Sequence, residues 1–323
     1  MKTWINFADA SVFAIPLIDA VGGVRVYEGM LIEGPQGWGE FSAPPGCDDE
    51  RAGRWLTASI EAGTVGWPDP IRGRVPVAVT VPAVDPDRAR RIVTDAGCRT
   101  AAVRVGDPDG TLATDIARLE VVRDALGPAG AIRCDANGNW DLDTAAAVIP
   151  ALDRAAGGLE FVEQPCRTLA EVSALRGRID IPVAVDQSIR DASDPLRLPL
   201  AASADIAVLT VAALGGVRRA LRIAEACGLP CVVSGALESS IGTAGGLALA
   251  GVLPDTGFAS TLGVGLLGGD IVSGGRTLMP VDGTLPVSPM PPAPDLARLA
   301  TFAAGAETVA RWRHRLASAQ HLI

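Results

Sequence analysis

The fold of this chain is decided by three apolar segments that each end in an acidic residue: Ala131-Ile-Arg-Cys-Asp135, Leu159-Glu-Phe-Val-Glu163 and Ile181-Pro-Val-Ala-Val-Asp186. The terminal acids are 28 and 23 residues apart, an interval that accommodates one strand, one helix and the two loops between them. This spacing predicts successive parallel strands, whose carboxyl ends meet at the same edge of a sheet. We therefore expect the three carboxylates to lie close together.

Three carboxylates at one edge would repel one another strongly unless positive charge lay between them. A divalent metal ion is the simplest source of that charge. The all-oxygen set of Asp135, Glu163 and Asp186 favours Mg²⁺ or Mn²⁺, because no His or Cys accompanies it in a suitable pattern. Ion pairs with Arg104 and Arg133 are the alternative. Arg133 has the same parity as Asp135, so some ion pairing is expected in either case.

An alternation of strand and helix patterns extends in both directions from these segments. Strand patterns occur at 75–84, 100–106, 131–137, 159–164, 181–186, 205–211, 230–235 and 258–263. Helical patterns occur at 85–97, 111–126, 141–155, 168–177, 194–203, 215–227 and 239–252. This order predicts a closed parallel α/β barrel, with its active site at the carboxyl ends of the strands. An open doubly wound sheet is the alternative, which the lack of a glycine-rich dinucleotide loop disfavours.

The segments on either side of the barrel pattern predict a small α+β unit. Residues 1–74 precede the barrel and residues 285–323 follow the barrel segment 75–284. The first segment has strand-like stretches at 3–16 and 23–33, a turn-rich 34–40 and a helix at 47–62. The last has a proline-rich linker at 286–294 and one helix from 295 to about 317, which we expect to pack on the N-terminal unit.

Composition narrows the classes of function. The net charge of −9 and the 4% aromatic content argue against nucleic acid as a partner, because there is no basic patch to neutralise phosphates. No apolar run approaches the roughly 18 residues of a membrane span, and no signal peptide is apparent, so we expect a soluble, cytoplasmic protein. Lys2 is the only lysine in the chain. The six cysteines form no close pair that reads as a zinc or redox motif.

Five motifs agree in order and spacing with a known family. They are Asp135-Ala-Asn-Gly-Asn-Trp140, Glu163-Gln-Pro-Cys166, Asp186-Gln-Ser-Ile-Arg190, Asp205-Ile-Ala-Val-Leu-Thr-Val-Ala-Ala-Leu-Gly-Gly216 and Ser234-Gly-Ala-Leu-Glu-Ser-Ser240. Together they resemble the enolase superfamily, most closely the o-succinylbenzoate synthases of actinobacteria, over nearly the whole chain. The resemblance implies a modified (β/α)7β barrel with a capping domain made from both chain ends. It also implies Mg²⁺ held by the three acids.

The resemblance further implies lysine acid/base groups that this chain lacks. In the family, a lysine removes the proton α to a substrate carboxylate and the metal stabilises the enediolate. The implied lysine positions read Ala102, Arg104 and Thr210 here. Arg104 cannot serve as a base, because a guanidinium stays charged in proteins. A general base contributes ~10²- to 10⁴-fold, so we expect the family's proton abstraction to be absent or severely impaired. Gln187 also replaces an acid that the resemblance implies, which removes one negative charge beside the metal site.

Arg104, Thr210 and Tyr27 are the catalytic candidates. Arg104 is interpreted either as a fixed cation for a substrate carboxylate or oxyanion, or as a structural partner for Asp135 or Glu163. Thr210 fits a space-filling replacement better than a nucleophile, because nothing nearby would activate its hydroxyl. Tyr27, the only tyrosine, would face the barrel mouth from the cap and supply an acid or a hydrogen bond, unless it is a surface aromatic.

The substrate-binding candidates lie at or near the strand ends. Ser234, Ser239 and Ser240 stand at a strand end and the following helix N-terminus, where they would suit an anion, although plain N-capping explains Ser239 nearly as well. The other candidates are Ala102, Asn137 and Gln187.

Three functional hypotheses remain from the sequence. The first is a divergent Mg²⁺-dependent enzyme that has lost lysine chemistry and catalyses a cyclisation, elimination or rearrangement of a carboxylate or dicarbonyl substrate in secondary metabolism. The second is o-succinylbenzoate synthase itself, a dehydratase of menaquinone biosynthesis. The third is a non-catalytic pseudoenzyme or binding protein that kept the barrel. The small-molecule carboxylate partner is common to the first two, and the sequence leaves the oligomeric state open.

Overall fold

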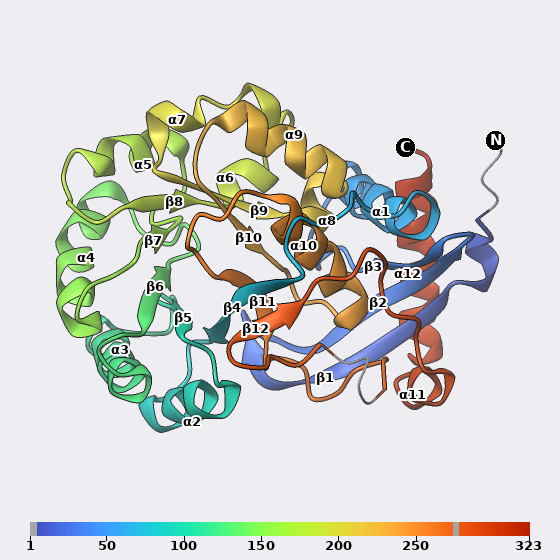
Figure 1. Ribbon diagram of the computed structural model, residues 1–323, viewed down its shortest axis with the longest axis horizontal. Helices are drawn as coiled ribbons and strands as arrows, with labels where there is room; N and C mark the ends of the chain where they lie inside the picture. Colours follow the sequence, from blue (N-terminus) through green and yellow to red (C-terminus); the bar gives the residue numbers. More distant parts are fainter. Residues whose placement is uncertain (1–4, 274–277) are drawn as a thin grey trace.

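The computed structural model describes residues 5–273 and 278–323, and its central element is a closed barrel of parallel strands (Figure 1). Neighbouring strands pair in sequence order from β4 to β11, and β11 pairs with β4 to close the barrel. The predicted barrel is confirmed, and an open sheet is excluded. The strands are β4 (Arg74–Val81), β5 (Thr100–Arg104), β6 (Ala131–Asp135), β7 (Val162–Glu163), β8 (Val183–Val185), β9 (Ile206–Thr210), β10 (Cys231–Ser234) and β11 (Ser260–Val264).

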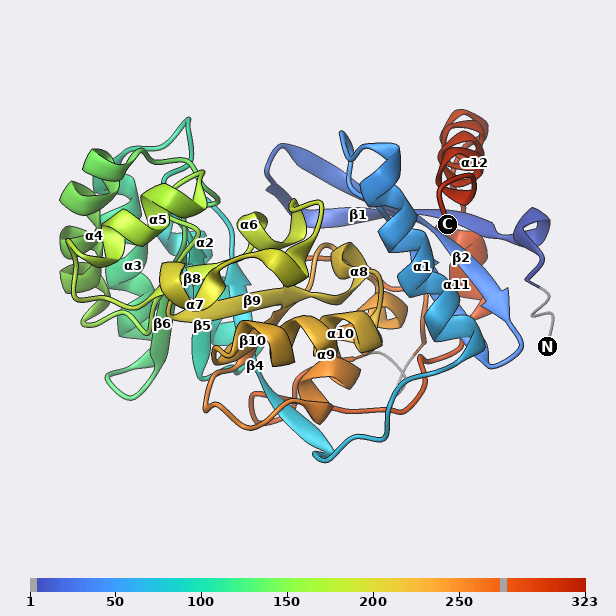
Figure 2. The same ribbon diagram turned by 90° about the horizontal axis from the view of Figure 1, so that it is seen from above.

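Helices on the outside of the barrel return the chain from one strand to the next (Figures 1 and 2). Several begin at a side-chain cap: Asp85, Asp141 and Thr168 each accept a hydrogen bond from the backbone N–H three residues later. The main helices are α2 (Pro86–Ala96), α3 (Leu112–Leu126), α4 (Leu142–Ala156), α5 (Leu169–Arg176), α9 (Val217–Cys227) and α10 (Ser240–Val252). Their apolar faces and the outward-facing strand residues form one continuous core, which fixes the strand ends in place.

A cap lies against the barrel and draws on both flanking segments of the chain (Figure 2). Its antiparallel sheet consists of β1 (Ser11–Val21), β2 (Val24–Gly34) and β3 (Gly37–Phe41). The helices α1 (Asp49–Thr64) and α12 (Ala306–Gln320) pack on this sheet, and Trp312 of α12 meets Phe41 of β3 edge to face, with ring centroids 5.6 Å apart. The N-terminal sheet and the C-terminal helix therefore share one core.

The close packing of α1 on β3 requires a glycine at position 39. A Cβ built on Gly39 would lie 2.0 Å from the backbone oxygen of Ser59, which no side chain tolerates. The approach fixes how the first cap helix sits on the sheet.

The structure corrects the sequence interpretation in three places. The helix expected from 295 to about 317 is two helices, α11 (Leu296–Thr301) and α12, with α12 beginning after Gly305. The turn-rich region 34–40 also contains the first four residues of β3 (Gly37–Phe41), which pairs with β2 and extends the sheet. The helix expected at 194–203 is a 3-10 turn (Pro195–Arg197) followed by the short α7 (Leu200–Ser203), since Pro199 lacks the N–H that a continuous helix would need there.

Short elements near the strand ends complete the description. Helices α6 (Gln187–Arg190) and α8 (Val211–Leu214) follow β8 and β9 directly, and β12 (Thr284–Pro286) adds to β4 in antiparallel orientation. The first two residues of the strand expected at 3–16 lie outside the described residues. Across the described parts of the chain, every helix is too short or too polar to span a bilayer.

Candidate active site at the barrel mouth

A cavity of about 690 Å³ lies between the cap and the carboxyl ends of the barrel strands. The barrel supplies its floor and the cap supplies its roof, from β2, the segment after β3, and α12. The predicted site residues that line it are Tyr27, Ala102, Arg104, Asp135, Asn137, Glu163, Asp186, Gln187 and Ser234. The structure thus brings residues from both ends of the chain to one cavity.

The three predicted metal ligands end neighbouring strands. Asp135 of β6 pairs in register with Glu163 of β7, and Asp186 follows β8. Glu163 and Asp186 are each 5% exposed. Burial raises the pKa of Glu163 well above its usual value, and the charges of Asp135 and Asp186 raise it further. Burial also raises the pKa of Asp186, against the opposing effect of Arg190. The carboxylates therefore form a site of excess negative charge that a cation would stabilise.

Two arginines provide part of that positive charge. Arg104 Nη1 lies 2.8 Å from Asp135 Oδ2, and Arg190 Nη1 lies 3.6 Å from Asp186 Oδ2. Arg133, the other predicted ion-pair partner, is fully buried inside the barrel and pairs with Glu160 at 2.7 Å instead of with the triad. Its guanidinium also stacks over Phe161, 4.6 Å from the ring centroid.

The triad has ligand atoms of the kind that a divalent ion prefers, but its side chains are not grouped around a single ion position. Its ligands are hard oxygens, and Asp186 Oδ1 is buried without a hydrogen-bond partner, which leaves an acceptor that an ion would fill. Within residues 5–273 and 278–323, however, no three His, Cys, Asp or Glu side chains are already grouped to hold a metal. Arg104 accounts for one acceptor, because it holds Asp135 Oδ2.

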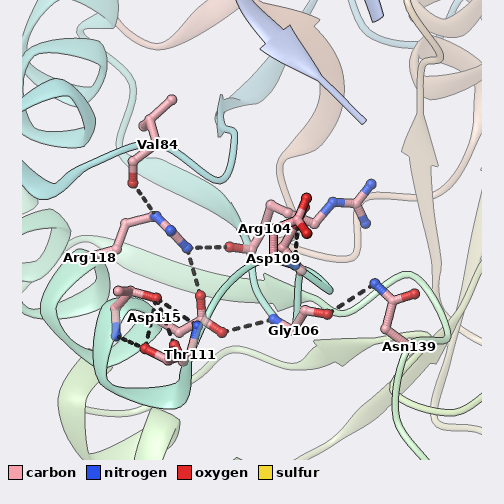
Figure 3. A network of polar contacts seen from close by, with 10 residues as sticks. Val84, Arg104, Gly106, Asp109, Thr111, Asp115, Arg118 and Asn139 are labelled. Carbon is pink, nitrogen blue, oxygen red and sulfur yellow. Dashed lines mark hydrogen bonds and ion pairs between the residues drawn. The ribbon is translucent and has the colours of Figure 1, made fainter. Parts of the chain in front are cut away.

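A buried network fixes the end of β5 and with it the position of Arg104 (Figure 3). Arg118 of α3 donates to the backbone oxygens of Val84 and Arg104 and pairs with Asp115 at 2.8 Å. Asp115 in turn accepts the backbone N–H of Gly106. The side chain of Arg104 points away from Arg118 in Figure 3, and Arg104 lines the cavity.

Gln164 fixes the turn that carries Asp186, a role the sequence does not reveal. Its amide oxygen accepts the backbone N–H groups of Asp186 and Ser188 at 3.0 and 3.1 Å, and its amide nitrogen donates to the backbone oxygen of Cys166. Gln187, the neighbour of Asp186, donates to Asn137 Oδ1. The turn of Asn137 and that of Asp186 are therefore linked across the floor.

Ser239 and Ser240 do not line the cavity, and their donors are engaged by the protein's own carboxylates. Ser239 donates its backbone N–H and its hydroxyl to Glu40 of β3, and Ser240 donates its hydroxyl to Asp270. Glu40 also accepts from Tyr27. Burial raises the pKa of Glu40 to about 6. The anion predicted at the N-terminus of α10 is thus supplied from within the chain and ties the cap to the barrel.

Thr210 stands at the end of β9, 3% exposed and outside the cavity lining. The cavity also includes Arg190, the last residue of one quoted motif, and two arginines of α12 that the sequence did not single out, Arg311 and Arg315. Arginines on surface helices carry no local signal of a site, so only the folded arrangement identifies them.

Family models and relatives of known name all match the chain to one family. The chain matches the family model described as "Enolase C-terminal domain-like" over residues 85–291, and "Enolase N-terminal domain-like" over residues 12–63. It is 51% identical to the o-succinylbenzoate synthase of Thermobifida fusca over 85% of this chain and 86% of the relative. It is 45% identical to that of Mycolicibacterium smegmatis over 97% of this chain and 95% of the relative.

Solved structures resemble the chain in fold. A muconate lactonizing enzyme from Pseudomonas fluorescens, complexed with muconolactone, superposes with a TM-score of 0.77 at 21% identity and covers 94% of this chain and 100% of its own. The L-Ala-D/L-Glu epimerase of Bacillus subtilis has a TM-score of 0.69 at 23% identity, covering 92% of this chain and 98% of its own.

Proposed function

Because the chain belongs to the enolase superfamily, we propose that it is an o-succinylbenzoate synthase, a lyase of menaquinone biosynthesis that dehydrates a cyclohexadiene carboxylate to o-succinylbenzoate. One observation carries the proposal: a relative of that name is 51% identical over 85% of this chain. The acidic triad at the ends of β6, β7 and β8 is the site at which a carboxylate substrate would react.

Asp135, Glu163 and Asp186 would hold Mg²⁺ or Mn²⁺, which would supply positive charge for a substrate oxyanion. The chain's own residues position the substrate. Arg104, held by the network around Arg118, offers guanidinium donors to a carboxylate that displaces Asp135 from them. The cap lies over this floor and contributes residues such as Tyr27 and Trp312 to the cavity wall.

The source of proton transfer separates two candidate reactions. Positions 102, 104 and 210 are Ala, Arg and Thr, and the only lysine of the sequence is Lys2. This observation favours, as a second candidate, a divergent lyase or cyclase whose reaction of a carboxylate or dicarbonyl substrate depends on charge stabilisation and not on a lysine base.

Turnover of the cyclohexadiene precursor tests the first candidate. The purified protein is assayed with Mg²⁺ or Mn²⁺ by the ultraviolet absorbance change on aromatisation, beside an o-succinylbenzoate synthase that carries the three lysines. Glu163→Gln is the matched control, because it removes one triad charge without changing size. Metal-dependent turnover that Glu163→Gln abolishes supports the proposal.

Turnover no faster than that of Glu163→Gln would reject the first candidate and leave the second. A rate within about tenfold of the lysine-containing enzyme would reject the second, because loss of a general base costs ~10²-fold or more.

A further inference from the structure

The roof of the cavity carries a positive charge that no reaction at the floor uses. Arg311 and Arg315 of α12 both line the cavity, one helical turn apart, on the side opposite the triad-bearing strand ends. Arg311 pairs with Glu28 of β2 at 2.5 Å, so its charge is matched within the protein.

Arg315 has no such match. In the described part of the chain, no carboxylate lies within ion-pair distance of its guanidinium, which instead donates to the backbone oxygens of Ala43 and Pro44 at 2.8 and 3.0 Å. The side chain is half-buried and stacks on Trp312, 4.9 Å from the ring centroid. Burial lowers the pKa of Arg315 and the like charge of Arg311 adds to this, yet a guanidinium remains charged. A fixed, partly desolvated cation in a cavity wall is stabilised by an anion that enters the cavity.

The rest of the cavity determines what kind of anion fits. Its floor has the acidic triad with Arg104 and Arg190, and its roof has Arg315. Apolar residues such as Val26, Pro82 and Leu266 also line the cavity. A ligand with one carboxylate at each end and an apolar middle matches this distribution of charge.

We propose that Arg315 forms a second anion subsite, which recognises the distal carboxylate of a dicarboxylate ligand whose other carboxylate lies at the triad. This inference rests on the proposed function for the ligand class, because o-succinylbenzoate carries an aromatic carboxylate and a succinyl carboxylate. Arg315 is thereby a specificity residue that holds the succinyl end, and Arg311 adds a long-range attraction that Glu28 attenuates.

Three stable ligands separate the two ends, each measured by calorimetry with the full chain in saturating Mg²⁺. They are o-succinylbenzoate, 4-oxo-4-phenylbutanoate, which lacks the ring carboxylate, and 2-butyrylbenzoate, which lacks the distal carboxylate. We expect Arg315→Gln to weaken the first two by about 10- to 100-fold, the effect of losing a charged hydrogen bond, and to leave 2-butyrylbenzoate unchanged.

Arg313→Gln is the matched control. Arg313 lies on the same helix and donates to the backbone oxygens of Phe7 and Ala10 at 2.6 and 2.7 Å, so it also ties α12 to the cap, but it does not line the cavity. Its replacement should leave all three affinities unchanged. If Arg315→Gln weakens all three ligands equally, or none of them, the subsite is wrong.

The unaltered protein gives an independent result should Arg315→Gln fail to fold. It must bind o-succinylbenzoate at least about tenfold more tightly than 2-butyrylbenzoate; equal affinities, or no binding of any ligand, overturn the subsite. Failure of the proposed function looks different: the predicted binding pattern without turnover of the precursor rejects the dehydratase and keeps the subsite. Turnover of the precursor, together with an Arg315→Gln protein that binds all three ligands as the unaltered protein does, keeps the dehydratase and rejects the subsite.

Discussion

Arg104 and Asp135 stand side by side at the ends of two paired strands, with Nη1 and Oδ2 2.8 Å apart. The guanidinium therefore takes a carboxylate oxygen that a divalent ion would otherwise bind, and its charge opposes a cation at the triad. We expect Arg104→Gln to raise the affinity for Mg²⁺ by about tenfold, one unit of 1.4 kcal/mol, which is well within the energy of one unit charge at this distance. Calorimetric titration with MgCl₂ measures it.

Arg90→Gln is the control for that titration, since Arg90 is a surface residue that pairs with Asp124 at 3.3 Å on the outside of the barrel. It should leave Mg²⁺ affinity unchanged. Equal or weaker Mg²⁺ binding by Arg104→Gln would show that the arginine does not compete with metal.

Restoring lysines tests whether positions 102, 104 and 210 belong to the reacting site. The triple variant Ala102→Lys, Arg104→Lys and Thr210→Lys should raise precursor dehydration by roughly 10²-fold, the lower contribution of a general base. Steady-state kinetics measure the gain. The same triple variant with Glu163→Gln should show none of it, and an unchanged rate in the triple variant would place the three positions outside the working site.

Glu238 makes stability depend on pH. Burial raises its pKa from 4.5 to about 8, and the charge of Glu40 contributes. Because the folded pKa is higher than the unfolded one, the folded state binds more protons, and the stabilisation present below about pH 4.5 is lost as pH rises through about 8. Glu238→Gln should remove this loss. The loss that it removes is about 1–2 kcal/mol in the free energy of unfolding at pH 8.5, after allowance for solvent screening.

Urea unfolding at pH 5.5 and 8.5 checks the sign for Glu238. The wild type should lose more stability between the two pH values than Glu238→Gln does. A variant with the same or a steeper loss would mean that Glu238 is ionised in the folded protein at pH 5.5.

Arg118 supports the site through the backbone. Arg118 is 5% exposed, and its guanidinium donates to Asp115 and to the backbone oxygens of Val84 and Arg104. Arg118→Met should lower the free energy of unfolding by about 3–5 kcal/mol, because Asp115 is left buried and unpaired. Arg90→Met, which removes an exposed pair, should cost less than about 1 kcal/mol. Denaturant unfolding measures both, and similar losses would contradict the structural role of the network.

Much of the fold follows from local patterns in the sequence. The barrel strands are short apolar runs at regular intervals and the helices carry caps such as Asp85 and Thr168, so each element is specified by its own residues. The same spacing places Asp135 beside Glu163 at one edge. Local secondary-structure propensity does not predict elements formed where several chain segments meet. An example is β3, whose pairing with β2 depends on the whole sheet.

The candidate site depends on contacts between distant residues, which no sequence window contains. Ser239 and Glu40 are 199 positions apart, yet they share two hydrogen bonds. Arg315 shows no distinguishing feature in its helix, and its position in the cavity wall appears only when α12 packs on the sheet. Spacing therefore predicts the floor of the site, while the roof requires the tertiary structure.

The cap is translated in two separate stages. Its sheet is made first, the barrel strands follow, and α12 is made after all of them. The strands that carry the triad are therefore complete before the part of the cavity wall that contains Trp312 and Arg315 has been translated. A chain that ended before α12 would lack this wall, so the complete cavity exists only in a chain that includes α12.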